Sequence, residues 1–252
     1  MDFSDAFRLT PPQSMDVEVY GAPLAEFSLD DVPLADPNEV STFVTPKRYR
    51  EHMTGRWLLG EVLKASGVGD LSTVQVVRNE YRAPSLVFIQ GVWKRTPLPN
   101  ISIAHSGDHA FLAVSKTALD VGFDAEPLSR VLAENAYDMM AKSVELDELR
   151  ASPEHAFQAW TGKEAVQKCL GKGMHINPRE IAIPIGLENS IISIENSKIE
   201  LVYWQEKGYH LSLAVKPSNP SLNAEDELLE KTRLAMEANP SWGIGCKTQR
   251  NG

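Results

Sequence analysis

Three side chains spaced four residues apart could carry chemistry: Trp160, Glu164 and Lys168. If the segment 157–174 is a helix, they lie along one stripe, with Glu164 one turn from Lys168. A carboxylate can accept a proton or bind a cation, and an ammonium can bind a phosphate. On an arbitrary helix, the same spacing is more often a surface ion pair that contributes only about 0.3 kcal/mol. The choice between these interpretations depends on what lies nearby.

A second acidic pair, Asp124 and Glu126, lies upstream in the segment 121–126. Its alternating pattern predicts a strand, on which side chains two residues apart share a face. Two carboxylates on one face repel each other unless a proton or a cation lies between them. Mg²⁺ prefers such oxygen ligands, completed by waters and substrate phosphates. The pair is therefore a candidate metal site, although alone it is a weak signal.

A histidine and a serine precede this acidic strand, at a predicted hairpin turn. Gly107 and Asp108 separate two apolar runs, 101–104 and 111–114, which is typical of a β-hairpin. His105 and Ser106 then lie at the turn end of the hairpin. His105 and His109 raise the alternative of a zinc site, but no cysteine pair or third nitrogen ligand has a fitting spacing. We therefore set zinc aside.

The elements that must position these residues can also be predicted. Ser152 as N-cap, Pro153 at the first helical position, and Gly171 and Gly173 as terminators bound the helix of Glu164. A second long helix is predicted over 45–64, with Pro46 in its first turn, and another begins at 143. Strands are predicted at 74–77, 85–89, 101–104, 181–185, 191–194, 199–204 and 210–215. A G-x-H-x-x-L-A-V pattern at 107–114 recurs at 208–215, which suggests two related halves.

Composition narrows the class of protein. The chain has 252 residues, of which 42% are hydrophobic, so it can bury one large core or two smaller ones. Its net charge of −9 argues against nucleic-acid binding as the main task. No apolar run approaches ~18 residues and the start lacks a secretion signal, so we expect a cytoplasmic protein without a membrane span. Cys169 and Cys246 are too few and too distant to suggest a disulfide framework.

The order of the three segments resembles a known family. A His-Ser-Gly-Asp hairpin, a Gly-x-Asp-x-Glu strand and a Trp-Thr-x-Lys-Glu-Ala-x-x-Lys-x-x-Gly-x-Gly helix are similar to the 4′-phosphopantetheinyl transferases, specifically the larger type of the surfactin and enterobactin systems. The resemblance covers about residues 42–216, and the block 160–173 is its most specific part. It implies transfer of the phosphopantetheine arm of coenzyme A to a serine of an apo acyl or peptidyl carrier protein.

The resemblance also implies roles for individual residues. Mg²⁺ would be bound by Asp124, Glu126 and Glu164. Glu164 would also help to deprotonate the carrier serine, with Lys168 beside it. His105 matches a contact to the 3′-phosphate of coenzyme A. The full set expected to bind coenzyme A is Lys47, Arg50, Arg56, Arg78, Arg82, His105, Ser106, Lys163 and Lys168.

The sequence departs from the family pattern in places. Ala104 stands where the family usually has a serine, so one hydroxyl contact to phosphate is in doubt. Arg82-Ala83-Pro84 replaces a Gly-Lys-Pro loop. Neither change removes a metal ligand. Two alternatives remain: a different Mg²⁺-dependent enzyme acting on a nucleotide diphosphate, and a catalytically silent module that binds coenzyme A or a carrier.

The residue types are consistent with this chemistry even when the resemblance is left aside. Transfer from a diphosphate needs a cation, basic side chains for the phosphates and a base for the attacking hydroxyl. The chain has no Walker motif, no Rossmann glycine string and no G-x-S-x-G elbow. We therefore expect the nucleophile to come from the partner protein.

The expected fold is α+β, with two similar halves related by a pseudo-two-fold axis. The resemblance gives each half a small antiparallel sheet packed with a long helix, and an active site between the halves. We expect an N-terminal half at 1–126 that holds coenzyme A, a C-terminal half at 127–217 with the catalytic helix, and a tail at 218–252 with an amphipathic helix between Pro220 and Pro240. Because one chain supplies both halves, we expect a monomer.

Overall fold

The computed structural model describes residues 2–13, 15–89 and 98–218. The chain divides into two compact units, Met1–Lys216 and Pro217–Gly252, and the fold described below is that of the first. The amphipathic helix predicted between Pro220 and Pro240 lies outside the described residues.

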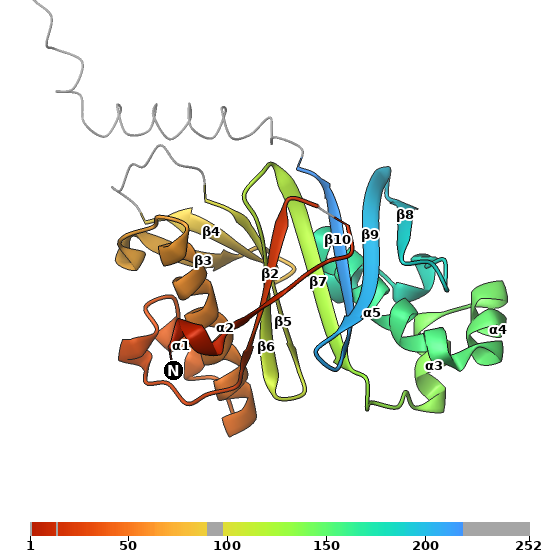
Figure 1. The fold of residues 1–252 in the computed structure, drawn as a ribbon, viewed down its shortest axis with the longest axis horizontal. Coiled ribbons are helices and arrows are strands. Elements are labelled where there is room, and N and C mark those ends of the chain that lie inside the picture. The colour runs from red at the N-terminus through yellow and green to blue at the C-terminus, as the bar shows by residue number, and fades with distance from the viewer. Residues whose placement is uncertain (1, 14, 90–97, 219–252) are drawn as a thin grey trace, which may run out of the picture. The chain divides into compact units, whose positions relative to one another are not determined.

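Two four-stranded sheets form the frame of the first unit, and each is accompanied by a long helix (Figure 1). The strand order is β1-β2-β6-β5 in the first sheet and β7-β10-β9-β8 in the second, while β3 and β4 form a separate hairpin. The strands are β1 (Phe7–Leu9), β2 (Val17–Pro23), β3 (Val74–Arg78), β4 (Pro84–Phe88), β5 (Asn100–Ser106), β6 (His109–Ser115), β7 (Leu119–Pro127), β8 (Asn189–Ile194), β9 (Ser197–Glu206) and β10 (Tyr209–Pro217).

The long helix of the first sheet is α2 (Pro46–Ala65), as the sequence predicts. The Thr45 hydroxyl accepts a hydrogen bond from the backbone N–H of Arg48 at 3.2 Å, and proline occupies the first turn. The buried face of α2 packs Met53 and Leu58 into one apolar cluster with Leu112 of β6. This packing fixes the helix against the sheet, so the basic side chains on another face of α2 are held in place.

The long helix of the second sheet is α5 (Ala156–Cys169). A short 3-10 turn at Pro153–His155 precedes it, and Ser152 makes no side-chain capping bond. The prediction that Ser152 caps this helix is therefore wrong, because the 3-10 turn intervenes. The predicted end is confirmed: Gly171 and Gly173 have φ angles of 65° and 50°, a left-handed region that glycine adopts at low cost.

Helix α5 lies directly against β7 at Gly122. A Cβ atom at this position would lie 1.9 Å from the backbone oxygen of Ala165 and 2.3 Å from the backbone nitrogen of Cys169. Only glycine permits such an approach of strand to helix. The glycine of the Gly-x-Asp-x-Glu strand therefore brings the acids of β7 close to α5.

The predicted hairpin is confirmed. Strands β5 and β6 pair antiparallel, with Ser106 opposite His109 and only Gly107 and Asp108 between them. Gly107 has a φ of 57°, which suits a tight turn. In addition, the backbone N–H of Phe123 donates to the Ser102 hydroxyl at 3.0 Å, which ties β5 of the first sheet to β7 of the second.

The α+β architecture with two sheet-and-helix halves is confirmed. The repeated G-x-H-x-x-L-A-V segments form β6 and β10, which are internal strands of the two sheets. Strand β7 belongs to the second sheet, although the predicted boundary after residue 126 assigns it to the first half. That boundary stays a prediction.

The strand predicted at 181–185 is wrong. Backbone groups of this segment bond to side chains instead of a neighbouring strand: the Ile181 carbonyl accepts from Lys163, and the Ile183 N–H donates to Glu145 at 3.0 Å. The shorter helices are α1 (Pro37–Val40), α3 (Glu134–Met140) and α4 (Ser143–Ala151). None of the helices in the described part of the chain is long and apolar enough to cross a membrane.

Candidate active site

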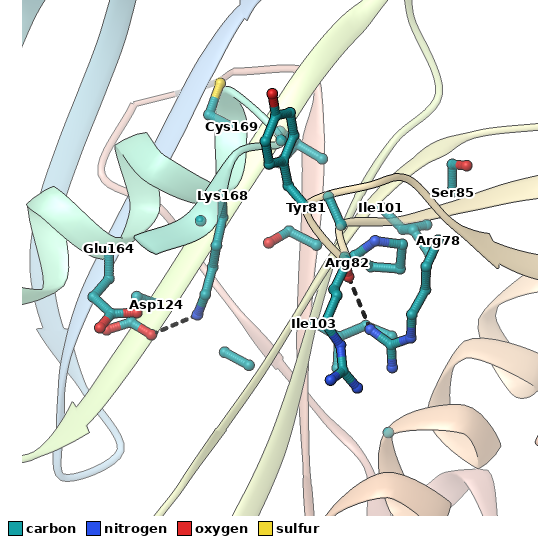
Figure 2. A pocket seen from close by; sticks show the side chains of 18 of the residues that line it. Arg78, Tyr81, Arg82, Ser85, Ile101, Ile103, Asp124, Glu164, Lys168 and Cys169 are labelled. Carbon is teal, nitrogen blue, oxygen red and sulfur yellow. Dashed lines mark hydrogen bonds and ion pairs between the residues drawn. The ribbon is translucent and has the colours of Figure 1, made fainter. Parts of the chain in front are cut away.

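A cavity of about 670 Å³ collects most of the predicted site residues. Its walls come from α2, the 78–85 loop, β5, β7 and α5. Figure 2 shows Arg78 and Arg82 on one side, and Asp124, Glu164 and Lys168 on the other. The predicted residues that line it are Arg56, Arg78, Arg82, His105, Asp124, Glu126, Glu164 and Lys168. The structure thus brings together residues that lie more than a hundred positions apart in the sequence.

The acidic side of the cavity is built around a partly buried ion pair. The Lys168 ammonium donates to an Asp124 carboxylate oxygen at 2.7 Å (Figure 2). It also donates to the Phe123 carbonyl at 3.1 Å. Lys168 therefore pairs with the strand acid and not with Glu164, its neighbour one turn away. The Glu164 side chain forms no hydrogen bond with any other described residue and lies beside Asp124 (Figure 2).

Burial and like charge both act on Asp124. Burial, together with the nearby Glu164 and Glu126 carboxylates, raises the pKa of Asp124 to about 7 against the opposing effect of Lys168. Burial lowers the pKa of Lys168, but Asp124 and Glu164 outweigh it, so this pKa is raised. The acids thus hold more negative charge than one lysine neutralises.

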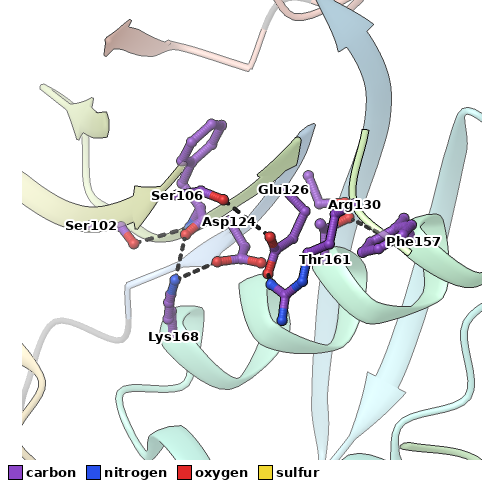
Figure 3. Close-up of polar contacts among 10 residues, drawn as sticks. Ser102, Ser106, Asp124, Glu126, Arg130, Phe157, Thr161 and Lys168 are labelled. Atoms are coloured by element: carbon purple, nitrogen blue, oxygen red, sulfur yellow. Dashed lines mark hydrogen bonds and ion pairs between the residues drawn. The ribbon is translucent and has the colours of Figure 1, made fainter. Parts of the chain in front are cut away.

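Glu126 has its own partners. The Ser106 hydroxyl donates to one carboxylate oxygen at 3.0 Å, and the Arg130 guanidinium contacts the other (Figure 3). Arg130 lies four residues beyond Glu126, just past the end of β7. Ser106 was predicted to bind coenzyme A, but the structure places its hydroxyl on Glu126 and outside the lining of the cavity.

The fit of a metal ion can be judged from these contacts. Asp124, Glu126 and Glu164 offer the oxygen donors that Mg²⁺ prefers, and their mutual repulsion favours a cation. Within the described residues, however, no three histidine, cysteine, aspartate or glutamate side chains form a ready-made metal site. Lys168 and Arg130 are the cations in contact with two of the acids. The oxygen atoms of these three acids are of the type that Mg²⁺ prefers. Because two of the acids are in contact with Lys168 and Arg130, their side chains must rearrange for Mg²⁺ to bind.

The opposite side of the cavity is a cationic cluster, which we define as Arg48, His52, Arg56, Arg78, Arg82 and His105. Arg48, His52 and Arg56 are spaced four apart on α2, so they form one stripe facing the cavity. Arg56 and Arg78 share Glu39, at 3.8 Å and 2.5 Å. One carboxylate thus serves two guanidinium groups, and the cluster retains a positive charge.

Several buried nitrogen atoms in the cationic cluster lack hydrogen-bond partners among the described residues. Nε2 of His52, Nε2 of His105, and two guanidinium nitrogens of Arg56 form no hydrogen bond with the described residues. Burial and then Arg56 lower the pKa of His52 to about 4, while burial and then Arg48 lower that of His105 to about 3. Because buried polar groups are normally paired, four such atoms in one cluster indicate a site for an anion.

Sequence reasoning missed several residues that line the cavity, and two of them have clear roles in its structure. His52 is one, although its i, i+4 spacing to Arg48 and Arg56 on a predicted helix is a usable signal. Asn79 is the other: its side-chain amide donates to the Gly171 carbonyl at 2.9 Å, and its oxygen accepts from the Tyr81 and Ala83 N–H groups. Asn79 thereby ties the 79–83 loop to the turn after α5.

The structure does not bring Lys47, Arg50 or Lys163 to the lining of the cavity. Lys163 is 1% exposed, and its ammonium donates to both Glu145 oxygens at 2.8 and 2.9 Å and to the Pro178 carbonyl at 3.1 Å. It therefore joins α4 and the 178–181 segment to α5. Lys47 lies 3.9 Å from Glu51 and Arg50 3.2 Å from Glu26, both off the inward stripe of α2.

Comparison with known protein families agrees with this arrangement. Residues 120–214 match the family model described as the 4′-phosphopantetheinyl transferase superfamily, from β7 through most of β10. This match covers less than half of the chain; it bears out the predicted resemblance to this superfamily and supports phosphopantetheine transfer with coenzyme A as substrate. Membership of the larger surfactin type stays a prediction. A search of curated proteins found no match.

Proposed function

We propose that this chain transfers the 4′-phosphopantetheine group of coenzyme A to a serine of an apo acyl or peptidyl carrier protein, in a Mg²⁺-dependent reaction. One observation carries the proposal. A single cavity has the cationic cluster on one side, four of whose buried nitrogens lack hydrogen-bond partners among the described residues, and an acid-lysine group, Asp124, Glu164 and Lys168, on the other. Coenzyme A has the matching features: a 3′-phosphate on its nucleotide and a diphosphate at its reactive centre.

The chain's residues have distinct roles in this proposal. The cationic cluster binds the 3′-phosphate, and Lys168 holds the diphosphate beside Asp124. Lys163, with its ammonium enclosed, positions α5 and hence Glu164. Asp124, Glu126 and Glu164 would hold Mg²⁺, which when bound neutralises charge on the leaving phosphate.

In the proposed transfer, one bond to phosphorus forms and another breaks. The serine oxygen of the carrier forms a bond to the phosphorus that bears the pantetheine, and the bond from that phosphorus to the bridging oxygen breaks. Adenosine 3′,5′-bisphosphate leaves with the bonding electron pair. Glu164, whose carboxylate has no hydrogen-bond partner among the described residues, takes the serine proton.

The proposal is tested by intact-mass analysis. Apo carrier proteins of the fatty-acid, polyketide and peptide types are incubated with the chain, coenzyme A and Mg²⁺. We expect at least one carrier to gain the mass of one phosphopantetheine group, and excess chelator to prevent the gain. If no carrier of any type gains mass, the chain is a silent module; full transfer in chelator would remove Mg²⁺ from the proposal.

A second expectation concerns His105. Its unpartnered Nε2 faces the cationic cluster, so His105→Ala should raise the KM for coenzyme A with a smaller effect on kcat. Loss of one hydrogen bond to a charged group costs about 1.5–3 kcal/mol. Steady-state kinetics with coenzyme A and with dephospho-coenzyme A, which lacks the 3′-phosphate, separate the possibilities. The variant should leave the kinetics with dephospho-coenzyme A nearly unchanged. Equal losses with both substrates would mean that His105 supports the hairpin or assists the chemical step.

A further inference from the structure

One acid outside the candidate active site, Glu39 of α1, is in contact with two of its cations. The Glu39 carboxylate lies 3.8 Å from the Arg56 guanidinium and 2.5 Å from that of Arg78. Arg56 belongs to α2 and Arg78 is the last residue of β3, so the two cations come from different elements. Both arginines line the cavity, whereas Glu39 is not among the described residues that line it. Glu39 therefore contacts the cationic cluster from outside the cavity.

Each arginine uses only part of its guanidinium group for Glu39. Arg56 approaches the carboxylate with Nη2, while its Nε and Nη1 are buried without a hydrogen-bond partner among the described residues. Arg78 also approaches with Nη2, and its Nη1 donates to the Arg82 carbonyl at 2.9 Å. The donors of a guanidinium lie in one rigid plane, so an anion held at one nitrogen restricts where the others point. Glu39 thus restricts the orientation of the two unpartnered nitrogens of Arg56.

Glu39 also offsets the repulsion between the two arginines. Burial and then Arg78 lower the pKa of Arg56 to about 10, while Glu39 acts in the opposite direction. Without an anion between them the two guanidinium groups would repel each other, and Arg78, whose side chain is 29% exposed, would turn toward solvent. A phosphate entering the cavity would then have to bring the two cations back together. Preorganisation by Glu39 removes that cost from binding.

The segment that carries Glu39, residues 36–43, is itself held in place. The Asp36 side chain caps α1 by accepting a hydrogen bond from the Asn38 N–H at 2.8 Å. Val40 is buried in the same apolar cluster as the inner face of α2. The position of the Glu39 carboxylate is therefore fixed before any ligand binds.

The same segment contacts the cationic cluster a second time, through Phe43. The Phe43 ring lies 4.9 Å from the His52 ring, and the Arg48 guanidinium lies 5.3 Å from the centre of the Phe43 ring. Phe43, like Glu39, is not among the described residues that line the cavity. The segment 36–43 thus contacts four of the six residues of the cationic cluster and leaves their cavity side open.

We propose that Glu39 is a positioning residue for the 3′-phosphate of coenzyme A: its carboxylate holds Arg56 and Arg78 together, so that both cations converge on the phosphate. This inference rests on the proposed function, since it concerns one end of the same substrate. Glu39 does not touch the substrate and keeps its contacts to both arginines when the phosphate binds.

The test measures the affinity of coenzyme A and of dephospho-coenzyme A by calorimetry, in the unmodified chain and in the variants Glu39→Gln and Glu39→Asp. Glu39→Gln should raise the Kd for coenzyme A at least about tenfold and the Kd for dephospho-coenzyme A less than about twofold. Glu39→Asp keeps the charge, so its affinity for coenzyme A should lie between the two. In steady-state kinetics the KM for coenzyme A should rise with little change in kcat.

Glu61→Gln is the matched control. Glu61 is an acid of α2 that accepts a hydrogen bond from Lys64 at 2.7 Å, and neither of these two described residues lines the cavity. The control removes one carboxylate from a cation, as Glu39→Gln does, and should leave both affinities unchanged.

Three results would overturn the inference. Tighter binding of coenzyme A by Glu39→Gln would mean that Glu39 competes with the phosphate. Equal losses for both ligands would mean that Glu39 only supports the fold, and unchanged affinities would mean that it does not position the arginines. If Glu39→Gln does not fold, Glu39→Asp decides: a loss confined to coenzyme A supports the inference, and equal losses for both ligands overturn it.

Failure of the proposed function would be seen separately. If coenzyme A binds and no carrier gains mass, the transfer is wrong, while a selective loss in Glu39→Gln still supports the positioning role. If carriers gain mass but the unmodified chain binds coenzyme A and dephospho-coenzyme A equally well, the transfer stands and the positioning role is overturned.

Discussion

Glu164→Gln is expected to lower kcat by about a hundredfold or more while the fold is retained. The substitution keeps the size of the side chain but removes its negative charge, so it can neither take the serine proton nor bind a cation as an anion. The Glu164 carboxylate forms no hydrogen bond with the other described residues. The variant therefore loses no hydrogen bond among these residues, although Lys168 loses one nearby negative charge.

The measurement is kcat at saturating coenzyme A and carrier, with thermal unfolding as the check on folding. Glu148→Gln, at an exposed acid of α4, is the matched control and should keep full activity. A Glu164→Gln variant with near-normal kcat would make Glu164 a structural residue of α5, and the general-base assignment would have to be abandoned.

Gly122→Ala is expected to lower the free energy of unfolding strongly, although it adds only one methyl group. The new Cβ would meet the Ala165 oxygen at 1.9 Å, the Cys169 nitrogen at 2.3 Å and the Cys169 Cα at 2.9 Å. All three are backbone atoms of α5, so no side chain can rotate away, and the helix must move from β7. Overpacking usually costs about 1–3 kcal/mol, and a backbone clash belongs at or above the top of this range. Because the movement separates Glu164 from Asp124, transfer should fall as well.

Urea unfolding measures this loss as a lower midpoint at similar slope. Gly69→Ala is the matched control, since a Cβ there meets nothing within 4 Å. A change of less than about 0.5 kcal/mol for Gly122→Ala, the range of ordinary surface substitutions, would show that α5 and β7 are not in direct contact at Gly122.

Local signals predicted much of the frame. Thr45 and Pro46 mark the start of α2, Gly107 and Asp108 mark the hairpin, and the glycines after α5 mark its end. Each signal acts within a few residues, through a cap, a turn or a left-handed backbone. Patterns of this kind can be recognised without knowing the rest of the fold.

The partners of charged side chains could not be predicted in the same way. Lys168 was expected beside Glu164 but pairs with Asp124, which lies on β7. Lys163 was expected near phosphates but is enclosed by Glu145 and backbone carbonyls. Helix periodicity tells which residues share a face of α5, but the packing of α4 and β7 decides what each face meets. That packing depends on contacts between distant parts of the chain.

The unpartnered nitrogens of the cationic cluster affect the stability of the folded protein. Nε2 of His52, Nε2 of His105, and Nε and Nη1 of Arg56 are buried without a hydrogen-bond partner among the described residues, and burial followed by the neighbouring Arg78 lowers the pKa of Arg56 to about 10. A ligand that binds only the folded state stabilises that state in proportion to the logarithm of its concentration. A phosphate bound at the cationic cluster would give these nitrogens hydrogen-bond partners. If coenzyme A binds at this cluster as proposed, its phosphate would contribute to the stability of the folded chain, and the midpoint of unfolding should rise with coenzyme A concentration.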